Sequence, residues 1–171
     1  MKILGISGGM RNGSNDGMCI EALMGAKEMG AEVEFIQLQN LHIEHCTGCT
    51  ACVQSVLGGR GGKCVLKDDF DWLLDKMLDA GLLDEAKLVY DHRQTYRTAA
   101  QAIGYKEFFP YFEGTAPLDA CTEKLKQASR NYAKRQLTWF RHMDGVVWLD
   151  ASAPDVTARA VQLTREFLAK G

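Results

Sequence analysis

Ala80-Gly81-Leu82-Leu83-Asp84-Glu85-Ala86 is the stretch on which the interpretation of this sequence depends. It follows an amphipathic helix predicted over residues 69–78, with Asp68 as its N-cap and apolar side chains at i, i+3, i+4, i+7 and i+8. In an α/β chain a buried β-run should come next. Instead the helical pattern continues, and most of the later sequence is helical too. We therefore expect two unrelated pieces to meet between Met77 and Leu83, an interval called the seam below.

Composition places few limits on the chain. Its 171 residues are enough to bury a core. The beginning is too short for a signal-peptide apolar region and no apolar run approaches a membrane span, so we expect no membrane contact and a cytoplasmic location. Residues 1–80 carry 7 Lys and Arg against 11 Asp and Glu, whereas residues 81–171 carry 13 against 11. The net charge changes from −4 to +2 where the pattern of elements changes.

The first forty residues predict a βαβ unit. A β-branched run over residues 2–6 enters a Gly-, Ser- and Asn-rich loop over residues 7–15, and a helix over residues 16–29 precedes an alternating strand over residues 31–38. Loop N–H groups and a helix N-terminus together can bind an anion. The alternative is a plain connection that needs small residues. The spacing is not that of the dinucleotide motif G-x-G-x-x-G.

Four cysteines follow with the spacing C-x2-C-x2-C-x11-C: Cys46, Cys49, Cys52 and Cys64. Thiolates at this spacing can bind an iron–sulfur cluster. Zinc fits less well, because its ligands usually come as two separated pairs. The alternative is a loop whose cysteines only pack. Cys19 and Cys121 lie on predicted apolar helix faces and are expected in the core.

Residues 1 to about 80 resemble the flavodoxin-like NADPH-dependent FMN reductases and the related iron–sulfur flavoproteins. The similarity is carried by residues 2–11, 46–52 and 63–69. It implies reduction by NAD(P)H or a protein donor, and FMN with its phosphate in the loop, held by Ser7, Gly8, Arg11, Gly13, Ser14 and Asn15. Asp16 departs from the family's usual hydroxyl residue, and the later strands that enclose the flavin have no counterpart.

The C-terminal half is dominated by a helix predicted over residues 118–140. Its apolar stripe includes Tyr132 and Trp139, and four basic residues lie on the opposite face: Lys126, Arg130, Lys134 and Arg141. No acidic residue occurs between Lys124 and His142. This pattern fits a solvated helix face, and it equally fits a surface that binds a phosphate backbone. Residues 146–149 predict a strand.

Residues 101–107 and 132–141 resemble the C-terminal part of tRNA dimethylallyltransferases, within a similarity that covers about residues 79–171. The resemblance implies contact with tRNA by Gly104, Tyr105, Lys106, Lys134, Arg135, Gln136, Thr138 and Arg141. That family's P-loop, catalytic Asp and prenyl-diphosphate site have no counterpart in the sequence. Prenyl transfer is therefore not expected.

Together these patterns predict an α/β chain, with a partial flavodoxin-like βαβ fragment over residues 1–80 and a mostly α-helical fragment over residues 81–171. Two or three strands leave a sheet face without partners, which favours a homo-oligomer. The main functional prediction is a residual FMN-binding, oxidoreductase-type unit without a complete active site. The alternative is a tRNA-binding module without prenyl-transfer activity.

Overall fold

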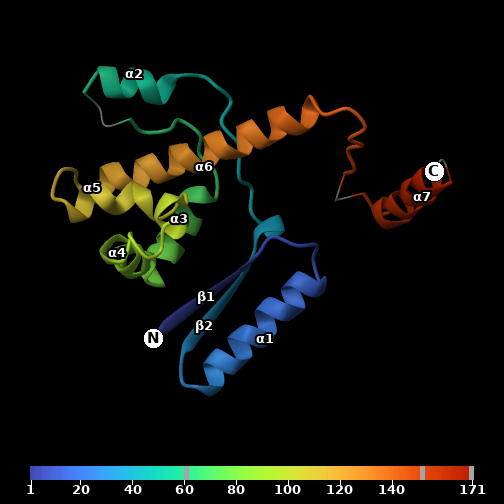
Figure 1. The fold of residues 1–171 in the computed structure, drawn as a ribbon, viewed down its shortest axis with the longest axis horizontal. Coiled ribbons are helices and arrows are strands. Elements are labelled where there is room, and N and C mark those ends of the chain that lie inside the picture. The colour runs from blue at the N-terminus through green and yellow to red at the C-terminus, as the bar shows by residue number, and fades with distance from the viewer. Residues whose placement is uncertain (60–61, 151–152, 170–171) are drawn as a thin grey trace. The chain divides into compact units, whose positions relative to one another are not determined.

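The computed structural model describes residues 1–59, 62–150 and 153–169 (Figure 1). It has two strands, β1 (Lys2–Ser7) and β2 (Glu32–Gln37). The helices are α1 (Ser14–Glu28), α2 (Ala51–Leu57), α3 (Phe70–Asp79), α4 (Leu82–Asp91), α5 (Phe109–Phe112), α6 (Leu118–Arg141) and α7 (Val156–Leu168), with 3-10 turns η1 (Leu38–Asn40), η2 (Ala99–Gln101) and η3 (Lys106–Phe108). The predicted α/β class is confirmed. The chain divides into two compact units, Met1–Leu137 and Thr138–Gly171.

Strands β1 and β2 are parallel, in a register that runs from Lys2 opposite Glu32 to Ser7 opposite Gln37. The connection between them is α1, so the predicted βαβ unit is present. A Cβ atom on Gly5 would lie 2.7 Å from side-chain atoms of both Cys19 and Leu23, which shows why glycine is needed where α1 approaches the sheet.

The predicted strand at residues 146–149 is wrong: these residues have no regular secondary structure. Within the described residues the sheet contains β1 and β2 and no third strand. An apolar β-branched run becomes a strand only when it pairs with another, and residues 146–149 form no such pair.

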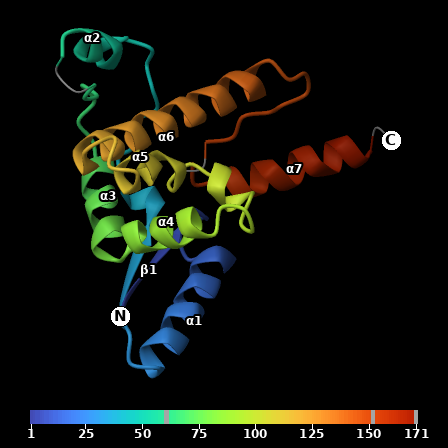
Figure 2. The same ribbon diagram turned by 60° about the vertical axis from the view of Figure 1, so that its left-hand side comes forward.

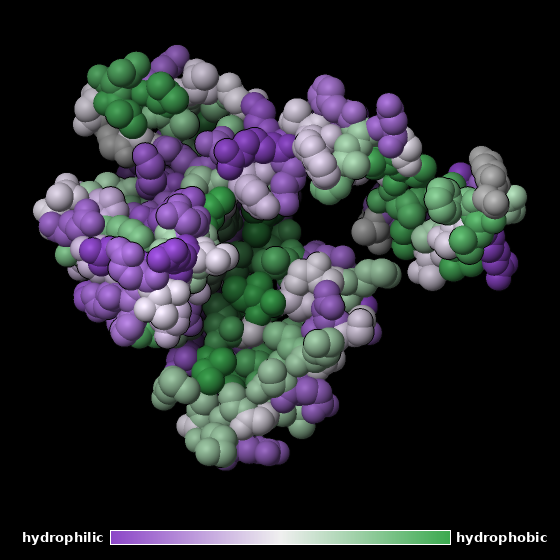
Figure 3. Space-filling model, viewed as in Figure 1, coloured by the Kyte–Doolittle hydropathy of each residue, from purple (hydrophilic) through white to green (hydrophobic). Residues whose placement is uncertain are grey.

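The small sheet covers only part of α1. Leu23 is buried, but the apolar residues Ile20 and Met24 of the same helix are exposed, Met24 by 52%. Two strands are too narrow to cover the full apolar side of a four-turn helix. Figure 3 shows apolar surface gathered along the strands and at α2, whereas the surface over α3, α4 and α5 is mostly hydrophilic. The predicted homo-oligomer therefore stays a prediction.

The core lies among the helices of the first unit and crosses the seam. Its buried residues come from α3, α4, η3 and α6: Leu74, Leu82, Ala86, Phe108, Cys121 and Leu125. Cys121 is in the core as predicted. Gly81 has a φ of +107°, a conformation that favours glycine, and it separates α3 from α4. The helix that was expected to continue through residues 80–86 is therefore interrupted: α3 ends at Asp79 and α4 begins at Leu82.

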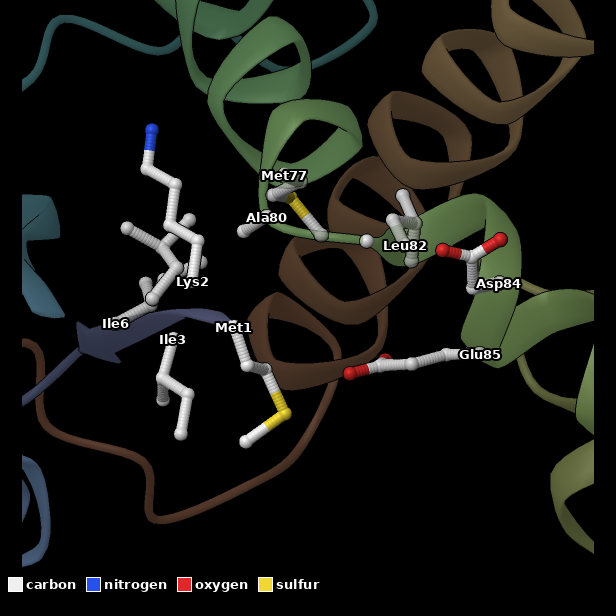
Figure 4. A pocket seen from close by; sticks show the side chains of 11 residues that line it. Met1, Lys2, Ile3, Ile6, Met77, Ala80, Leu82, Asp84 and Glu85 are labelled. Carbon is white, nitrogen blue, oxygen red and sulfur yellow. The ribbon is translucent and has the colours of Figure 1, made fainter. Parts of the chain in front are cut away.

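Helices α3, α4 and α5 lie on one side of α6, and α2 lies on the other (Figures 1 and 2). The strands meet this cluster through Glu34, which pairs with Lys76 at 2.8 Å and with Lys2 at 3.6 Å. A hollow of about 540 Å³ lies beside β1, with Met77, Ala80 and Leu82 of the α3–α4 connection on its other side (Figure 4). Among the described residues, no helix is long and apolar enough to cross a membrane.

Candidate nucleic-acid interface

Arg130, predicted on the outer basic face of α6, is buried with 3% of its side chain exposed. Its guanidinium donates two hydrogen bonds to the carboxylate of Asp68, at 2.6 and 2.7 Å, and one to the main-chain oxygen of Glu44 at 2.7 Å. Asp68 also accepts hydrogen bonds from the main-chain N–H groups of Glu44 and Phe70. Arg130 therefore fastens α6 to the start of α3 and to the preceding loop.

The electrostatics of this pair follow from its geometry. Hydrogen bonds from Arg130 hold the pKa of the Asp68 carboxyl far below its usual range, against the opposing effect of burial. Lys126 is also neutralised. Burial works to lower its pKa, but its ion pairs with Asp71 and Glu123 prevail and raise it. The predicted basic face is thus wrong for Lys126 and Arg130, because Asp68, Asp71 and, from α6 itself, Glu123 pair with them.

The turn before η3 is held by a buried carboxylate. The Glu107 side chain accepts a hydrogen bond at 2.9 Å from the N–H of Gly104, whose φ is +111°. The Tyr105 hydroxyl lies 3.5 Å from the Glu85 carboxylate on α4. Burial, followed by the charge of Glu85, raises the pKa of Tyr105. Gly104 and Tyr105, both predicted RNA contacts, thus shape the turn that presents Lys106.

Lys106 and Arg135 line one hollow of about 600 Å³. It joins the two motifs singled out in the sequence, and its walls are Gln101, Ala102, Ile103, Lys106, Ser129, Tyr132 and Arg135. We call it the first hollow. In the part of the chain that the structure describes, neither Lys106 nor Arg135 forms an ion pair with a carboxylate.

Tyr132 supplies an aromatic wall to the first hollow. It was predicted in the apolar stripe of the long helix, but 48% of it is exposed. The Arg135 guanidinium lies 6.0 Å from the centre of its ring. The stripe prediction fails here because the helical core ends with Leu125, one to two turns earlier. An exposed aromatic ring in the same hollow as two cations can stack on a nucleobase while the cations contact phosphates.

The other predicted RNA contacts lie outside the first hollow. The Lys134 ammonium lies beside Gly48, where an added Cβ atom would be only 2.6 Å away. Gln136 is exposed on α6. Thr138 and Arg141 are exposed residues of the second compact unit. Sequence reasoning did not select Ser129 or Tyr132 as contacts, although both lie within a turn of Ala133 and the basic pair that follows it.

The Ser7–Asn15 loop, predicted to bind a phosphate, surrounds an anion that the chain itself supplies, the carboxylate of Asp16 in the first turn of α1. The Asp16 carboxylate is buried, with 5% of the residue exposed, and accepts hydrogen bonds from the Ser7 hydroxyl and, at 2.8 Å, from the Asn12 N–H. Gln37 donates to the same carboxylate at 3.4 Å. The hydrogen bond from Ser7, followed by those from Asn12 and Gln37, outweighs burial and lowers the pKa of Asp16.

The loop therefore does not fit the phosphate of FMN. Its hydroxyl and one of its N–H donors already serve Asp16, and a second anion there would meet a carboxylate of like charge. The remaining predicted contacts have other roles: the Gly13 N–H donates to the Met10 oxygen at 2.9 Å, and Arg11 donates to the Gln39 oxygen at 3.4 Å. Gly8 directly follows β1, and Ser14 and Asn15 are the first two residues of α1.

The cysteines of the predicted cluster are free thiols: Cys46, Cys49, Cys52 and Cys64. Among the described residues, no group of three or more His, Cys, Asp or Glu side chains is gathered closely enough to hold a metal ion. Hydrogen bonds from Ala51 and Thr47 lower the pKa of Cys49, which is exposed just before α2. The iron–sulfur cluster stays a prediction without support from this geometry.

Known proteins give two kinds of similarity. The tRNA dimethylallyltransferase of Lactobacillus gasseri is 59% identical over 98 residues, which are 57% of this chain and 32% of that protein. A solved structure, the tRNA delta(2)-isopentenylpyrophosphate transferase of Staphylococcus epidermidis, is 26% identical with a TM-score of 0.45 and covers 88% of this chain and 43% of its own. A flavone reductase structure is 74% identical with a TM-score of 0.34, over 47% of this chain and 21% of its own.

The chain thus spans about a third of the length of the curated relatives it matches. A family model described as IPP transferase matches residues 32–143, which is more than half of the sequence and includes α3, α4, both motifs and the first hollow. The resemblance of the C-terminal part is therefore confirmed, whereas the flavodoxin-like resemblance stays a prediction. This chain belongs to the IPP transferase family.

Proposed function

We propose that this chain is an RNA-binding module whose ligand is tRNA, held at the first hollow. The observation that carries the proposal is that Lys106 and Arg135, from two separate motifs, line one hollow with Tyr132, and that within the described residues no carboxylate neutralises them. The relatives named tRNA dimethylallyltransferases support tRNA as the ligand.

The charges of this site favour a phosphate backbone over other ligands. Lys106 donates to the main-chain oxygen of Gln101 at 2.9 Å, so its ammonium is positioned but keeps its charge and two N–H donors. Arg135 is exposed, and its guanidinium lies 6.0 Å from the centre of the Tyr132 ring. Two cations beside an aromatic ring bind a flexible strand through phosphates and stacking, without strong sequence preference.

The proposal is tested with the double variant Lys106→Ala/Arg135→Ala in tRNA-binding measurements at rising salt. Affinity at low salt should fall about tenfold or more, and the slope of log K against log salt should flatten by up to two contacts, each worth about 0.7 to 0.9. The matched control is Lys27→Ala/Lys67→Ala, which removes the same charge from exposed residues remote in the sequence.

Two results would overturn this function. One is an unchanged salt slope in the Lys106→Ala/Arg135→Ala protein, and the other is an equal loss in the control pair, which would mean that net charge alone governs binding. Both results are read from fluorescence anisotropy when each variant is titrated against the same labelled tRNA. No feature of the Ser7–Asn15 loop or of the cysteines favours a second function.

A further inference from the structure

A second hollow, of about 380 Å³, adjoins the first. Its walls are Arg93, Gln94, Arg97, Ala100, Gln101 and Phe109, from the end of α4 to the start of α5. Gln101 lines both hollows, so they meet at this residue. Neither Arg93 nor Arg97 belongs to the two motifs that suggested RNA contact, and the second hollow has no role in the function proposed above.

Within the described residues, no carboxylate neutralises either arginine of the second hollow. Arg93 and Arg97 are exposed and form no ion pair within the described residues. Each instead donates to a main-chain oxygen: Arg93 to that of Tyr90 at 2.8 Å, and Arg97 to that of Gln94 at 3.3 Å. A guanidinium has five N–H donors, so most of them remain available to a ligand.

The surroundings of Arg93 hold it in place without neutralising it. Its guanidinium carbon lies 4.4 Å from the centre of the Tyr90 ring. The carboxylate of Asp91, two residues before it, is taken by the Lys87 ammonium at 2.6 Å. The cation is therefore oriented in advance, and the nearest carboxylate in the sequence is already paired.

The two hollows repeat one arrangement. Each has two unneutralised cations and one aromatic ring, Tyr132 in the first and Phe109 in the second. An isolated phosphate or a single nucleotide would need only one such set. A strand of nucleic acid repeats phosphate and base along its length, and its binding sites repeat cation and aromatic ring accordingly.

We infer that the second hollow is a further phosphate-binding subsite, so that a single-stranded segment of RNA crosses Gln101 and occupies both hollows. This inference rests on the proposed function and extends it. The ligand is then an unpaired stretch of several nucleotides, such as a loop, because a double helix would not present its bases to two aromatic rings in neighbouring hollows.

The test uses the full chain and a fluorescent single-stranded RNA of about a dozen nucleotides, within the range that such grooves hold. Arg93→Ala/Arg97→Ala should weaken binding about tenfold and flatten the salt slope by up to two contacts of about 0.7 each. Arg93→Lys/Arg97→Lys should recover most of the slope, because the charge is kept. Both pairs are exposed, and circular dichroism verifies that each variant is folded.

The other variants separate this inference from the function on which it rests. If Lys106→Ala/Arg135→Ala weakens binding and Arg93→Ala/Arg97→Ala behaves like Lys27→Ala/Lys67→Ala, the second subsite is overturned and the proposed function stands. If the unmodified protein binds no RNA at low salt, both are overturned. Losses that add in the fourfold variant would support two subsites on one strand.

Discussion

Arg130 and Arg135 lie on the same helix, five residues apart, yet their surroundings are opposite. Arg130 is buried and paired with Asp68, whereas Arg135 is exposed and has no carboxylate partner within the described residues. The sequence gives both the same context, a basic run without acidic residues. The counter-ion of Arg130 lies 62 residues away in the chain.

This difference separates basic residues that hold the fold together from those that can hold a ligand. A cation whose carboxylate partner comes from the same chain has little left to offer a phosphate. The Ser7–Asn15 loop is the same case with the charges reversed: Asp16 takes the donors that an external anion would need. The presence of an internal counter-charge, more than the number of charges, decides where an anion can bind.

The largest effect should come from removing Arg130. Arg130→Ala leaves the Asp68 carboxylate buried without its partner, and such a change costs about 3–5 kcal/mol of unfolding free energy. Arg135→Ala, on the same helix, should change stability by less than about 0.5 kcal/mol. Urea unfolding followed by circular dichroism measures both. Equal midpoints for the two variants would remove the distinction between the two arginines.

Lowering the pH should remove the stability that the Asp68–Arg130 pair contributes to the unmodified protein. The folded pKa of Asp68 is lowered, so its contribution to stability is present above its unfolded pKa, about 3.9, and is lost as the pH falls towards the folded value. Arg130→Ala lacks this contribution, so the gap in stability between it and the unmodified protein should narrow below about pH 4. Urea unfolding at a series of pH values tests this, and a gap that stays constant would contradict it.

A smaller effect is expected in the N-terminal loop. Asp16→Ser removes the carboxylate that joins Ser7, Asn12 and Gln37, so the denaturant midpoint should fall, though less than in Arg130→Ala. The same change should raise affinity for FMN, because the competing anion is gone. Glu21→Ser on the exposed side of α1 is the control. Tight, stoichiometric quenching of FMN fluorescence by the unmodified protein would show that Asp16 does not exclude the phosphate.

The smallest effect should come from Lys126. Its partner Asp71 is half-exposed and its other partner, Glu123, lies one turn away on the same helix, so Lys126→Gln should cost about 1 kcal/mol, well below the cost of Arg130→Ala. It removes one positive charge from α6, as Arg135→Gln does. RNA affinity should change in Arg135→Gln and not in Lys126→Gln. A similar loss in both would mean that the helix attracts RNA through its total charge alone.

The limits of several elements could be predicted from the sequence. Both strands, α1 and α6 begin and end within about two residues of their predicted limits, because turn-forming Gly, Ser, Asn and Pro residues separate them. Two segments differ from the prediction. The short helix α2 has no regular apolar pattern that would predict it. Residues 146–149 contain β-branched residues, but within the described residues they pair with no strand.

The candidate site was predictable in part. Lys106 and Arg135 came from motifs of a known family, and both line the first hollow. Arg93 and Arg97 belong to no motif, and only folding brings their hollow against Gln101. The burial of Arg130 could not be predicted, because a charged side chain is buried only where it has a partner. The sequence indicates Asp68 only as a helix cap, and not as that partner.

The core that crosses the seam has a consequence for how the protein unfolds. Leu74 comes from before the seam, Leu82 lies within it, and Ala86, Phe108 and Leu125 come from after it, yet all pack into one cluster. Neither side can bury its apolar residues without the other, so α3 and the later helices should melt together as one cooperative unit. Although the sequence patterns before and after the seam differ, heat or denaturant should unfold this cluster of helices in a single transition.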